Sequence, residues 1–203
     1  MSEETRNVID VSSLERYGFG PRATSWWATL GFMVVEGTTL AICASSYLYL
    51  TRRFQNWPPL RTPPPDLIIP TISVIALLAS VLIARQVKRN ARAYDIMGTR
   101  KWLTIGSVAS IVLLILRALE YNSLNTRWEN DAYGSIVWIT ISIHSTLLLV
   151  DFFESFFIGL IFWLGPVEKK HFGDADDDAF YWYFMVGSWI PLYFLLYIFP
   201  RLV

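Results

Sequence analysis

Long apolar runs separated by short polar segments dominate the pattern of this chain. The longest run covers residues 132–165 and has few interruptions. A membrane-spanning helix needs about 20 mainly apolar residues, whereas a run of this length and apolarity does not suit a helix of a soluble domain. The pattern therefore predicts a membrane-spanning helix over 132–165.

Four more runs of similar character predict four more spans. The composition agrees, because 54% of the residues are hydrophobic and only 17% are charged, which is unusual for a soluble domain. The sequence thus predicts an all-α, polytopic membrane protein with five transmembrane helices in one bundle. The expected spans are residues 26–50, 67–87, 102–119, 132–165 and 180–199.

The residues before the first span differ in character from the rest. They are polar and finish with Gly18, Gly20 and Pro21, which favour a break in helical structure. We therefore divide the chain into a polar N-terminal arm over 1–22 and a transmembrane domain over 23–203. The first residues contain no short apolar segment of the signal-peptide type, so we expect no cleavable signal peptide.

The segments between the expected spans have distinct compositions. Residues 51–65 are rich in proline and predict a stiff connecting loop. Residues 88–101 predict a basic loop that contacts anionic lipid headgroups. Residues 166–178 contain an acidic run that we interpret as a solvated loop, because a cation site would need a defined ligand loop. The run consists of Asp174, Asp176, Asp177 and Asp178.

The distribution of basic residues predicts the orientation of the chain. Ten Lys and Arg residues belong to the arm and to the segments 88–101 and 166–178, against five on the opposite side. Basic residues are enriched on the cytoplasmic side of membrane proteins. We therefore expect the N-terminus inside and the C-terminus outside.

Ionisable side chains interrupt several of the expected spans. Glu36 lies near the middle of the first span and Glu120 at the end of the third. In the fourth span, a rotation of about 100° per residue places His144 and Asp151 almost on one line, with Glu154 about 60° away. Because an ionisable group in hydrocarbon costs roughly 2.5–3.5 kcal/mol, all three should face protein or water.

The depth of each group follows from the helical rise of about 1.5 Å per residue. Glu36 and His144 both fall roughly 15 Å from a membrane surface, so we expect them to be partners. His144 is then a structural hydrogen-bond partner rather than a ligand. Two interpretations of Glu36 stay open: a protonated carboxyl bonded to a neighbour, and a site that supports proton delivery or lipid binding.

Four further positions complete the set of candidate residues. Asp151 and Glu154 fall near the inner face, level with Tyr183. We favour the interpretation that both acids reach the membrane interface, since a helix over 132–165 is longer than the ~30 Å hydrocarbon core. Glu120 follows Arg117 by three positions, which predicts an ion pair near the outer surface.

The residue types limit the chemistry of this chain. His144 and His171 are its two histidines, and they cannot form a multi-histidine iron site or a bis-histidine heme site, because 171 belongs to an expected loop. Cys43 and the methionines give no credible copper site. A net charge of zero gives no electrostatic basis for nucleic-acid binding. We therefore expect no metal, no cofactor and no independent catalysis.

An ordered series of short motifs runs through all five expected spans. Each motif is weak alone, but their order along the chain resembles that of subunit III of the heme-copper terminal oxidases, which include cytochrome c and quinol oxidases. The motifs are Gly31-Phe32-Met33-Val34-Val35-Glu36 with Tyr47, Pro70-Thr71-Ile72 with Ala79-Ser80, Trp102-Leu103-Thr104 with Glu120-Tyr121, Tyr133-Gly134-Ser135 with His144, and Tyr181-Trp182-Tyr183-Phe184 with Trp189.

The resemblance implies a non-catalytic component of a bacterial terminal oxidase, of the short five-helix type. In such a complex, oxygen reduction is coupled to proton pumping, and heme and copper belong to partner subunits. The implied location is the bacterial cell inner membrane. The implied partners are the catalytic subunit I, other respiratory subunits and phospholipids. The chain would stabilise the catalytic subunit, bind lipid and support proton uptake, with Glu36 and His144 as the functional pair.

Several positions depart from the family pattern. Where the family has two histidines, an acid and a glutamine, this chain has other residues, and two acids look like additions. Two alternative functions stay open: an accessory subunit of a nitric-oxide reductase, and a small proton-coupled transporter that uses its stripe of acids as a relay. A stand-alone membrane enzyme is disfavoured by the missing ligand sets. The departures are Leu147, Tyr183, Val186 and Arg117, and the additions are Asp151 and Glu154.

Overall fold

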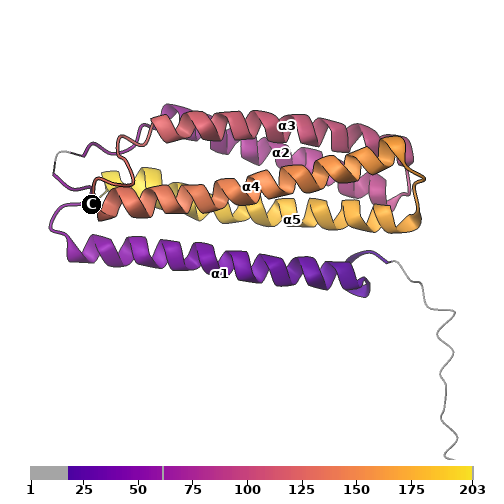
Figure 1. The fold of residues 1–203 in the computed structure, drawn as a ribbon, viewed down its shortest axis with the longest axis horizontal. Helices are drawn as coiled ribbons and strands as arrows, with labels where there is room; N and C mark the ends of the chain where they lie inside the picture. The colour runs from indigo at the N-terminus through magenta and orange to yellow at the C-terminus, as the bar shows by residue number, and fades with distance from the viewer. Residues whose placement is uncertain (1–17, 61, 203) are drawn as a thin grey trace, which may run out of the picture.

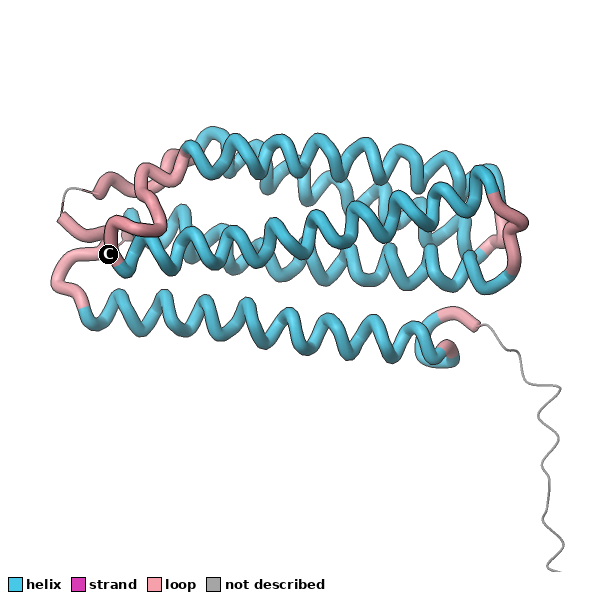
Figure 2. Tube along the Cα trace, viewed as in Figure 1, coloured by secondary structure: helices cyan, strands magenta, loops and turns pink. Residues whose placement is uncertain are grey.

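A computed structural model describes residues 18–60 and 62–202 of the chain. Within these residues the regular structure is entirely helical (Figures 1 and 2). Most of the expected polar arm, including Arg6 and Arg16, lies outside the described residues. The long helices are α1 (Thr24–Arg53), α2 (Ile68–Arg92), α3 (Ile96–Asn122), α4 (Ala132–Leu164) and α5 (Lys169–Tyr193).

Short helical turns extend two of these helices. A 3-10 turn, Gly20–Arg22, precedes α1, and a π-helical segment, Phe194–Ile198, and a 3-10 turn, Phe199–Arg201, continue α5. All five long helices are long and apolar enough to cross a membrane, as the apolar runs predict. The 33 residues of α4 rise through about 50 Å, so this helix exceeds a ~30 Å hydrocarbon core.

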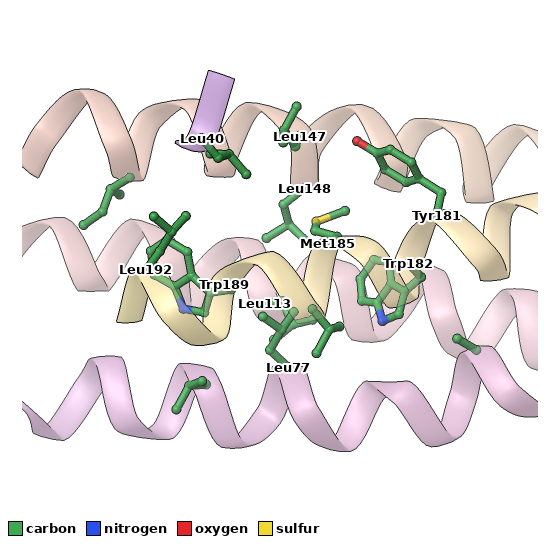
Figure 3. Packing of buried hydrophobic residues seen from close by; sticks show 14 of the residues in the cluster. Leu40, Leu77, Leu113, Leu147, Leu148, Tyr181, Trp182, Met185, Trp189 and Leu192 are labelled. Atoms are coloured by element: carbon green, nitrogen blue, oxygen red, sulfur yellow. The ribbon is translucent and has the colours of Figure 1, made fainter. Parts of the chain in front are cut away.

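The helices form one bundle with α5 at its centre. Helix α5 packs against α2, α4 and α1, whereas α1 packs against α4 and α5 at one side of the bundle (Figure 1). Buried side chains of α5, among them Met185 and Trp189, meet Leu148 of α4, Leu113 of α3 and Leu77 of α2 in the core (Figure 3). Helix α1 is the least enclosed span, since only 11% of its most apolar stretch is buried.

The Gly134-Ser135 motif has a clear structural role at the start of α4. The Asp131 carboxylate caps the helix by accepting a hydrogen bond from the Gly134 N–H at 2.7 Å, as N-cap residues commonly do. A Cβ on Gly134 would lie 2.1 Å from the Arg127 carbonyl oxygen, so only glycine fits. Ser135 donates to the Trp128 carbonyl at 2.7 Å. The motif therefore fixes the loop between α3 and α4.

Two of the expected loops are much shorter than predicted. The basic segment reduces to residues 93–95, because α2 ends at Arg92 and α3 begins at Ile96. The acidic segment reduces to 165–168, because α5 begins at Lys169. Both predictions placed charged residues outside helices, whereas the structure keeps them in the end turns of helices.

The start of α5 explains why its first turns are helical. The Glu168 carboxylate and the His171 side chain form a reciprocal cap, in which the Glu168 N–H donates to His171 Nδ1 at 3.0 Å. The Lys170 ammonium lies 2.9 Å from the exposed Glu168 carboxylate and lowers its pKa by hydrogen bonding to the charged form.

Candidate functional site

The buried polar residues gather into two groups at different heights in the bundle. We call the first the Arg117 cluster, and it joins α3, α4 and α5. We call the second the acidic cluster, and it joins α1, α4 and α5 closer to the connection between α4 and α5. The Arg117 cluster consists of Arg117, Glu120, His144 and Trp189; the acidic cluster consists of Glu36, Asp151, Glu154, Ser155, Asp178 and Tyr181.

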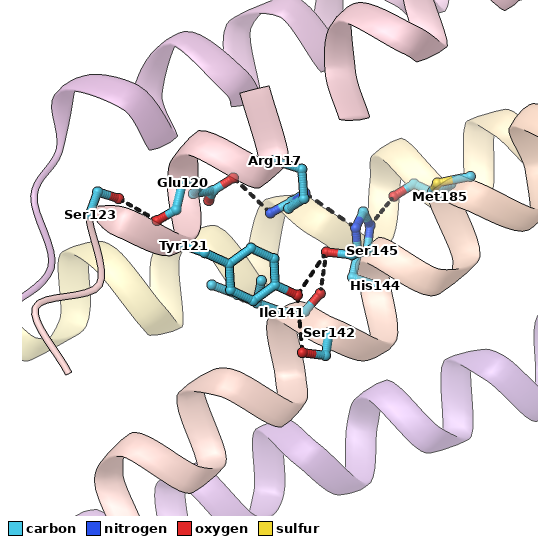
Figure 4. Close-up of polar contacts among 9 residues, drawn as sticks. All are labelled: Arg117, Glu120, Tyr121, Ser123, Ile141, Ser142, His144, Ser145 and Met185. Carbon is cyan, nitrogen blue, oxygen red and sulfur yellow. Dashed lines mark hydrogen bonds and ion pairs between the residues drawn. The ribbon is translucent and has the colours of Figure 1, made fainter. Parts of the chain in front are cut away.

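Arg117 is buried, and both of its terminal nitrogens have partners, whereas its Nε has none among the described residues (Figure 4). Its Nη1 donates to Glu120 Oε2 at 2.8 Å, and its Nη2 lies 3.3 Å from His144 Nδ1. Its guanidinium also lies over the Trp189 ring, 3.7 Å from the ring centroid, within the range of a cation–π interaction. The positive charge is therefore neutralised inside the bundle.

The hydrogen bonds of His144 determine its tautomer. Nε2 lies 3.1 Å from the Met185 carbonyl oxygen, and a carbonyl can only accept, so Nε2 carries the hydrogen. An arginine can only donate, so Nδ1 is the acceptor for Arg117. His144 is therefore a neutral imidazole that connects α3 to α5. Both of its nitrogens are engaged, which leaves neither for a metal.

The predicted pairing of Glu36 with His144 is wrong. Glu36 instead accepts a hydrogen bond from the Tyr181 hydroxyl, at 2.7 Å from Oε2. The two residues were matched by depth, but depth does not define the direction in which each side chain points. His144 points to α3 and α5, whereas Glu36 lies on α1 against Tyr181 of α5.

The predicted Arg117–Glu120 ion pair is present, but its surroundings differ from the prediction. The Glu120 side chain is fully buried and the Arg117 side chain is 5% exposed, so the pair faces the interior of the bundle. Its predicted height near the outer membrane surface stays a prediction, and Glu120 lies two residues before the end of α3. The sequence missed the link from Arg117 to His144, since a spacing of 27 residues carries no local signal.

Asp151 is the most isolated polar group of the acidic cluster. Its side chain is fully buried, and neither carboxyl oxygen has a hydrogen-bond partner among the described residues. Asp151 therefore faces the interior of the bundle, and its predicted height near the membrane interface stays a prediction. Its helical stripe with His144 is confirmed in one respect, since both side chains face the interior of the bundle.

Asp178 of α5 stands opposite Asp151. The Ser155 hydroxyl lies 2.8 Å from both carboxyl oxygens of Asp178. Asp151 lies on α4 one helical turn before Ser155, the residue that binds Asp178. Glu36 and Glu154 add two more carboxyl groups to the field around Asp151.

Glu154 differs from the rest of the stripe because its side chain is exposed on the outside of the bundle. It lies ten residues before the end of α4, which corresponds to about 15 Å along the helix. Exposed Phe157, Leu160 and Trp163 follow it toward that end. Glu154 therefore interrupts an exposed apolar surface of α4, and the expectation that it faces protein or water stays a prediction.

The acidic run 174–178 is a helical and largely buried segment, so its interpretation as a solvated loop is wrong. Asp176, Asp177 and Asp178 are each at most 6% exposed. Asp176 receives two bonds from Arg92, at 2.6 Å from Nε and 3.2 Å from Nη2. The Lys88 ammonium lies 3.8 Å from the same carboxylate.

The basic residues of the expected 88–101 loop thus have a partner inside the protein. Lys88 also approaches Tyr183, with its ammonium 5.7 Å from the ring centroid. Tyr183 is half-buried beside this ion pair and not in the acidic cluster. The opposite charges of the basic segment 88–92 and the acidic segment 174–178 were the sequence signal from which a contact between the two segments could have been predicted.

A small cavity lies on the other side of Asp178. It has a volume of about 30 Å³, with Ser80, Ser110, Ser155 and Asp178 among its lining residues, and this is room for one or two water molecules. The Trp182 indole N–H donates to the Ser80 hydroxyl at its edge, at 2.8 Å. Within residues 18–60 and 62–202, no group of three or more His, Cys, Asp or Glu side chains could hold a metal ion.

The chain is similar to two proteins named cytochrome c oxidase subunit 3. It is 24% identical to the protein of Synechocystis sp. over 172 residues, which cover 82% of this chain and 72% of the relative. It is 25% identical to the protein of Corynebacterium diphtheriae over 134 residues, which cover 62% of this chain and 63% of the relative. No protein-family model matches the chain. The two similarities support the cytochrome c oxidase subunit III family, with this chain as a divergent relative.

Proposed function

We propose that this chain is a non-catalytic, subunit III-like component of a bacterial heme-copper terminal oxidase of the short five-helix type. The observation that carries the proposal is the similarity to a cytochrome c oxidase subunit 3 over 82% of the chain. The five apolar helices and the ordered motifs of the sequence support it. In this function the chain belongs to an aerobic respiratory complex that reduces oxygen and pumps protons.

We assign heme and copper to partner subunits, above all to the catalytic subunit I. The engagement of both His144 nitrogens by Arg117 and Met185 supports this assignment. The outer side of α1 carries exposed Phe32, Val35 and Ile42, and such a face suits contact with another subunit or with phospholipid.

Phospholipid would also fit between α1 and α5. An apolar groove of about 480 Å³ lies there, lined by side chains that include Leu40, Ala44, Leu192 and Leu195. Its apolar walls suit an acyl chain.

The N-terminus lies inside and the C-terminus outside in this proposal, within a bacterial inner membrane. The support is the clustering of basic residues at one end of the bundle, where α2 ends and where α3 and α5 begin. The division into an arm over 1–22 and a transmembrane domain over 23–203 belongs to the same proposal. The acidic cluster then lies in the inner part of the membrane, on the side from which an oxidase takes up protons.

Glu36, Asp151 and Glu154 are the residues to which we assign support of proton uptake. All three belong to the acidic cluster: Asp151 has no hydrogen-bond partner among the described residues, Glu154 is exposed, and Glu36 is bonded to Tyr181 alone among those residues. Glu120, His144 and Tyr183 receive structural roles, because each contacts a partner that holds two helices together. Glu36 and Tyr181 thus replace Glu36 and His144, the functional pair expected from the sequence.

A pull-down in mild detergent tests the proposal. A tagged chain should bring a partner whose optical spectrum shows heme, while the chain stripped of that partner should show none. The purified complex should consume oxygen. Consumption of nitric oxide instead would favour an accessory subunit of a nitric-oxide reductase, and a chain that is pigmented or active alone would overturn the proposal.

The unpartnered acids of the acidic cluster favour a second candidate, a small proton-coupled transporter. In that case the carboxyl groups would form a relay through the bundle. The chain alone, reconstituted into liposomes, should then move protons together with a solute. Liposomes that show no such flux, next to a heme-bearing complex in the pull-down, would remove this alternative.

A further inference from the structure

We propose that a groove between α3 and α4 binds an anionic phospholipid, with an acyl chain in the groove and the phosphate at Arg100 and Lys101. This surface is distinct from the apolar groove between α1 and α5. Such a site requires that the chain lies in a membrane, and it does not depend on a role in an oxidase.

The groove lies between two helices that pack against each other (Figure 1). It has a volume of about 290 Å³, and its walls are mainly apolar. Ser107 and Gly159 are the small residues of its lining, whereas Phe156, Leu160 and Trp163 are large and exposed. The small residues leave a hollow between the large ones. A flexible hydrocarbon chain can follow such a hollow and gain van der Waals contacts along it.

Two cations stand at the end of the groove where α3 begins. Arg100 and Lys101 precede Thr104, a residue of the lining, by four and three positions, so both lie one turn away on its side of the helix. The Arg100 guanidinium lies 5.5 Å from the centroid of the Trp163 ring, and the Trp163 indole donates to the Thr104 hydroxyl at 3.0 Å. The positive charge is therefore held beside the groove.

These two positive charges are not compensated by the chain. Within residues 18–60 and 62–202, no ion pair includes Arg100 or Lys101. Arg100 uses its Nε to bind the Phe162 carbonyl oxygen, and neither of its terminal nitrogens has a hydrogen-bond partner among the described residues. Arginine suits phosphate oxygens through its fork of donors, and lysine adds a second positive charge. The end of the groove therefore offers a phosphate-binding pair.

The combination of the two surfaces selects the occupant. Free phosphate would bind the cations and leave the apolar groove unfilled, whereas an apolar partner helix would fill the groove and leave the cations unpaired. A zwitterionic lipid brings a second positive charge to an end that is already positive. An anionic phospholipid matches both the groove and its charged end, as basic pockets between membrane helices commonly do for anionic headgroups.

Native mass spectrometry of the full-length chain tests the inference. The chain is purified in mild detergent with equal amounts of phosphatidylglycerol and phosphatidylcholine. We expect phosphatidylglycerol to be retained in preference to phosphatidylcholine. Arg100→Gln and Lys101→Gln should each lower that retention about fivefold, because one basic residue near a membrane surface contributes about that factor to the binding of anionic lipid. The Lys101 side chain is exposed, so Lys101→Gln tests the site without disturbing the contact of Arg100 with Phe162.

Arg127→Gln is the matched control. This exposed cation follows the opposite end of α3, and its replacement should leave the retention unchanged. Variants at 100 and 101 that behave like this control would overturn the proposal. Equal retention of the two lipids would indicate a site without headgroup selection, and retention of neither would indicate a partner helix as the occupant. Either result would also overturn the proposal.

A second pair of variants tests the position of the acyl chain independently of charge. Val108→Trp places a large side chain in the groove and keeps both cations, so retention of phosphatidylglycerol should fall severalfold. Val112→Trp is the control, because Val112 is exposed on the same helix but does not line the groove. Equal retention in the two variants would refute the groove as the site. Because neither measurement needs a heme-bearing partner, their failure and the failure of the pull-down are separate results.

Discussion

The Arg117 cluster and the acidic cluster use helix α4 in opposite ways. His144 and Asp151 stand seven residues apart on the same side of this helix, about 10 Å along its axis. In the Arg117 cluster the arginine, the imidazole and one glutamate oxygen have partners. In the acidic cluster Asp151 has none. The same helix therefore carries one polar group that fixes the fold and one that the fold leaves unsatisfied.

This difference teaches that burial alone does not distinguish structural from functional polar residues. His144 and Asp151 are equally buried. What separates them is whether neighbouring helices supply complementary atoms, which α3 and α5 do for His144. Replacing Arg117 and replacing Asp151 should therefore change the stability of the protein with opposite signs.

The largest effect is expected for Arg117→Leu. This change leaves Glu120 buried and charged and removes the donor to His144. Breaking a buried ion pair by deleting one partner typically costs about 3–5 kcal/mol. The free energy of unfolding, measured in mixed detergent micelles, should fall by that amount.

The exposed Arg127–Glu129 pair provides the matched control for this prediction. Its atoms are 3.8 Å apart and both side chains are largely exposed. Arg127→Leu should change the stability by about 0–1 kcal/mol. Equal losses of stability in the two variants would mean that the buried Arg117–Glu120 pair contributes no more than the exposed Arg127–Glu129 pair.

Asp151→Leu should produce the opposite sign. The substitution removes two buried oxygens without partners, and leaving such a group unsatisfied costs about 1–3 kcal/mol. We expect the variant to be more stable than the wild type by part of that amount, while proton uptake is impaired. A loss of stability comparable to that of Arg117→Leu would mean that Asp151 has a partner in the folded chain.

Ser155→Ala should have a smaller effect. It removes the hydroxyl that binds Asp178, and a single hydrogen bond contributes about 0.5–1.5 kcal/mol. The loss should appear in thermal unfolding. Ser145→Ala is the control, because Ser145 donates to the Ile141 carbonyl of its own helix and lies away from both aspartates.

The smallest effect on stability is expected for Glu36→Gln, below about 1 kcal/mol, because the amide oxygen can still accept from Tyr181. Assembly should stay intact, while turnover slows or the active lifetime of the complex shortens. Tyr181→Phe separates the two roles, since it removes the hydrogen bond and keeps the carboxyl. Unchanged activity of Glu36→Gln over many turnovers would contradict a role in proton uptake.

The sequence predicted the elements that depend on apolar length and missed those that depend on tertiary partners. The expected span 132–165 agrees with helix α4, Ala132–Leu164, because an apolar run of this length does not suit a helix of a soluble domain. The start of α5 was placed eleven residues too late, at 180 instead of Lys169. Its aspartates resemble a loop in sequence, and only Arg92 and Lys88 of α2 explain why they are buried.

The candidate residues show the same limit. Their presence and approximate height followed from helical geometry, but the pairing of Glu36 with His144 did not. Height is set by the rise along one helix, whereas pairing depends on how each helix is rotated about its axis. The rotation is fixed by packing, such as the approach of Gly37 to Phe184, which a single sequence does not encode in a readable way.

The placement of α1 at one side of the bundle has a consequence for how this protein tolerates change. The other four helices pack closely against one another. Helix α1 packs against α4 and α5 only on one side, and most of its surface is exposed. Mutations on that surface can accumulate without disturbing the interior. The exposed residues of helix α1 can thus change to fit a different partner subunit or lipid, while the packing of the other four helices stays the same.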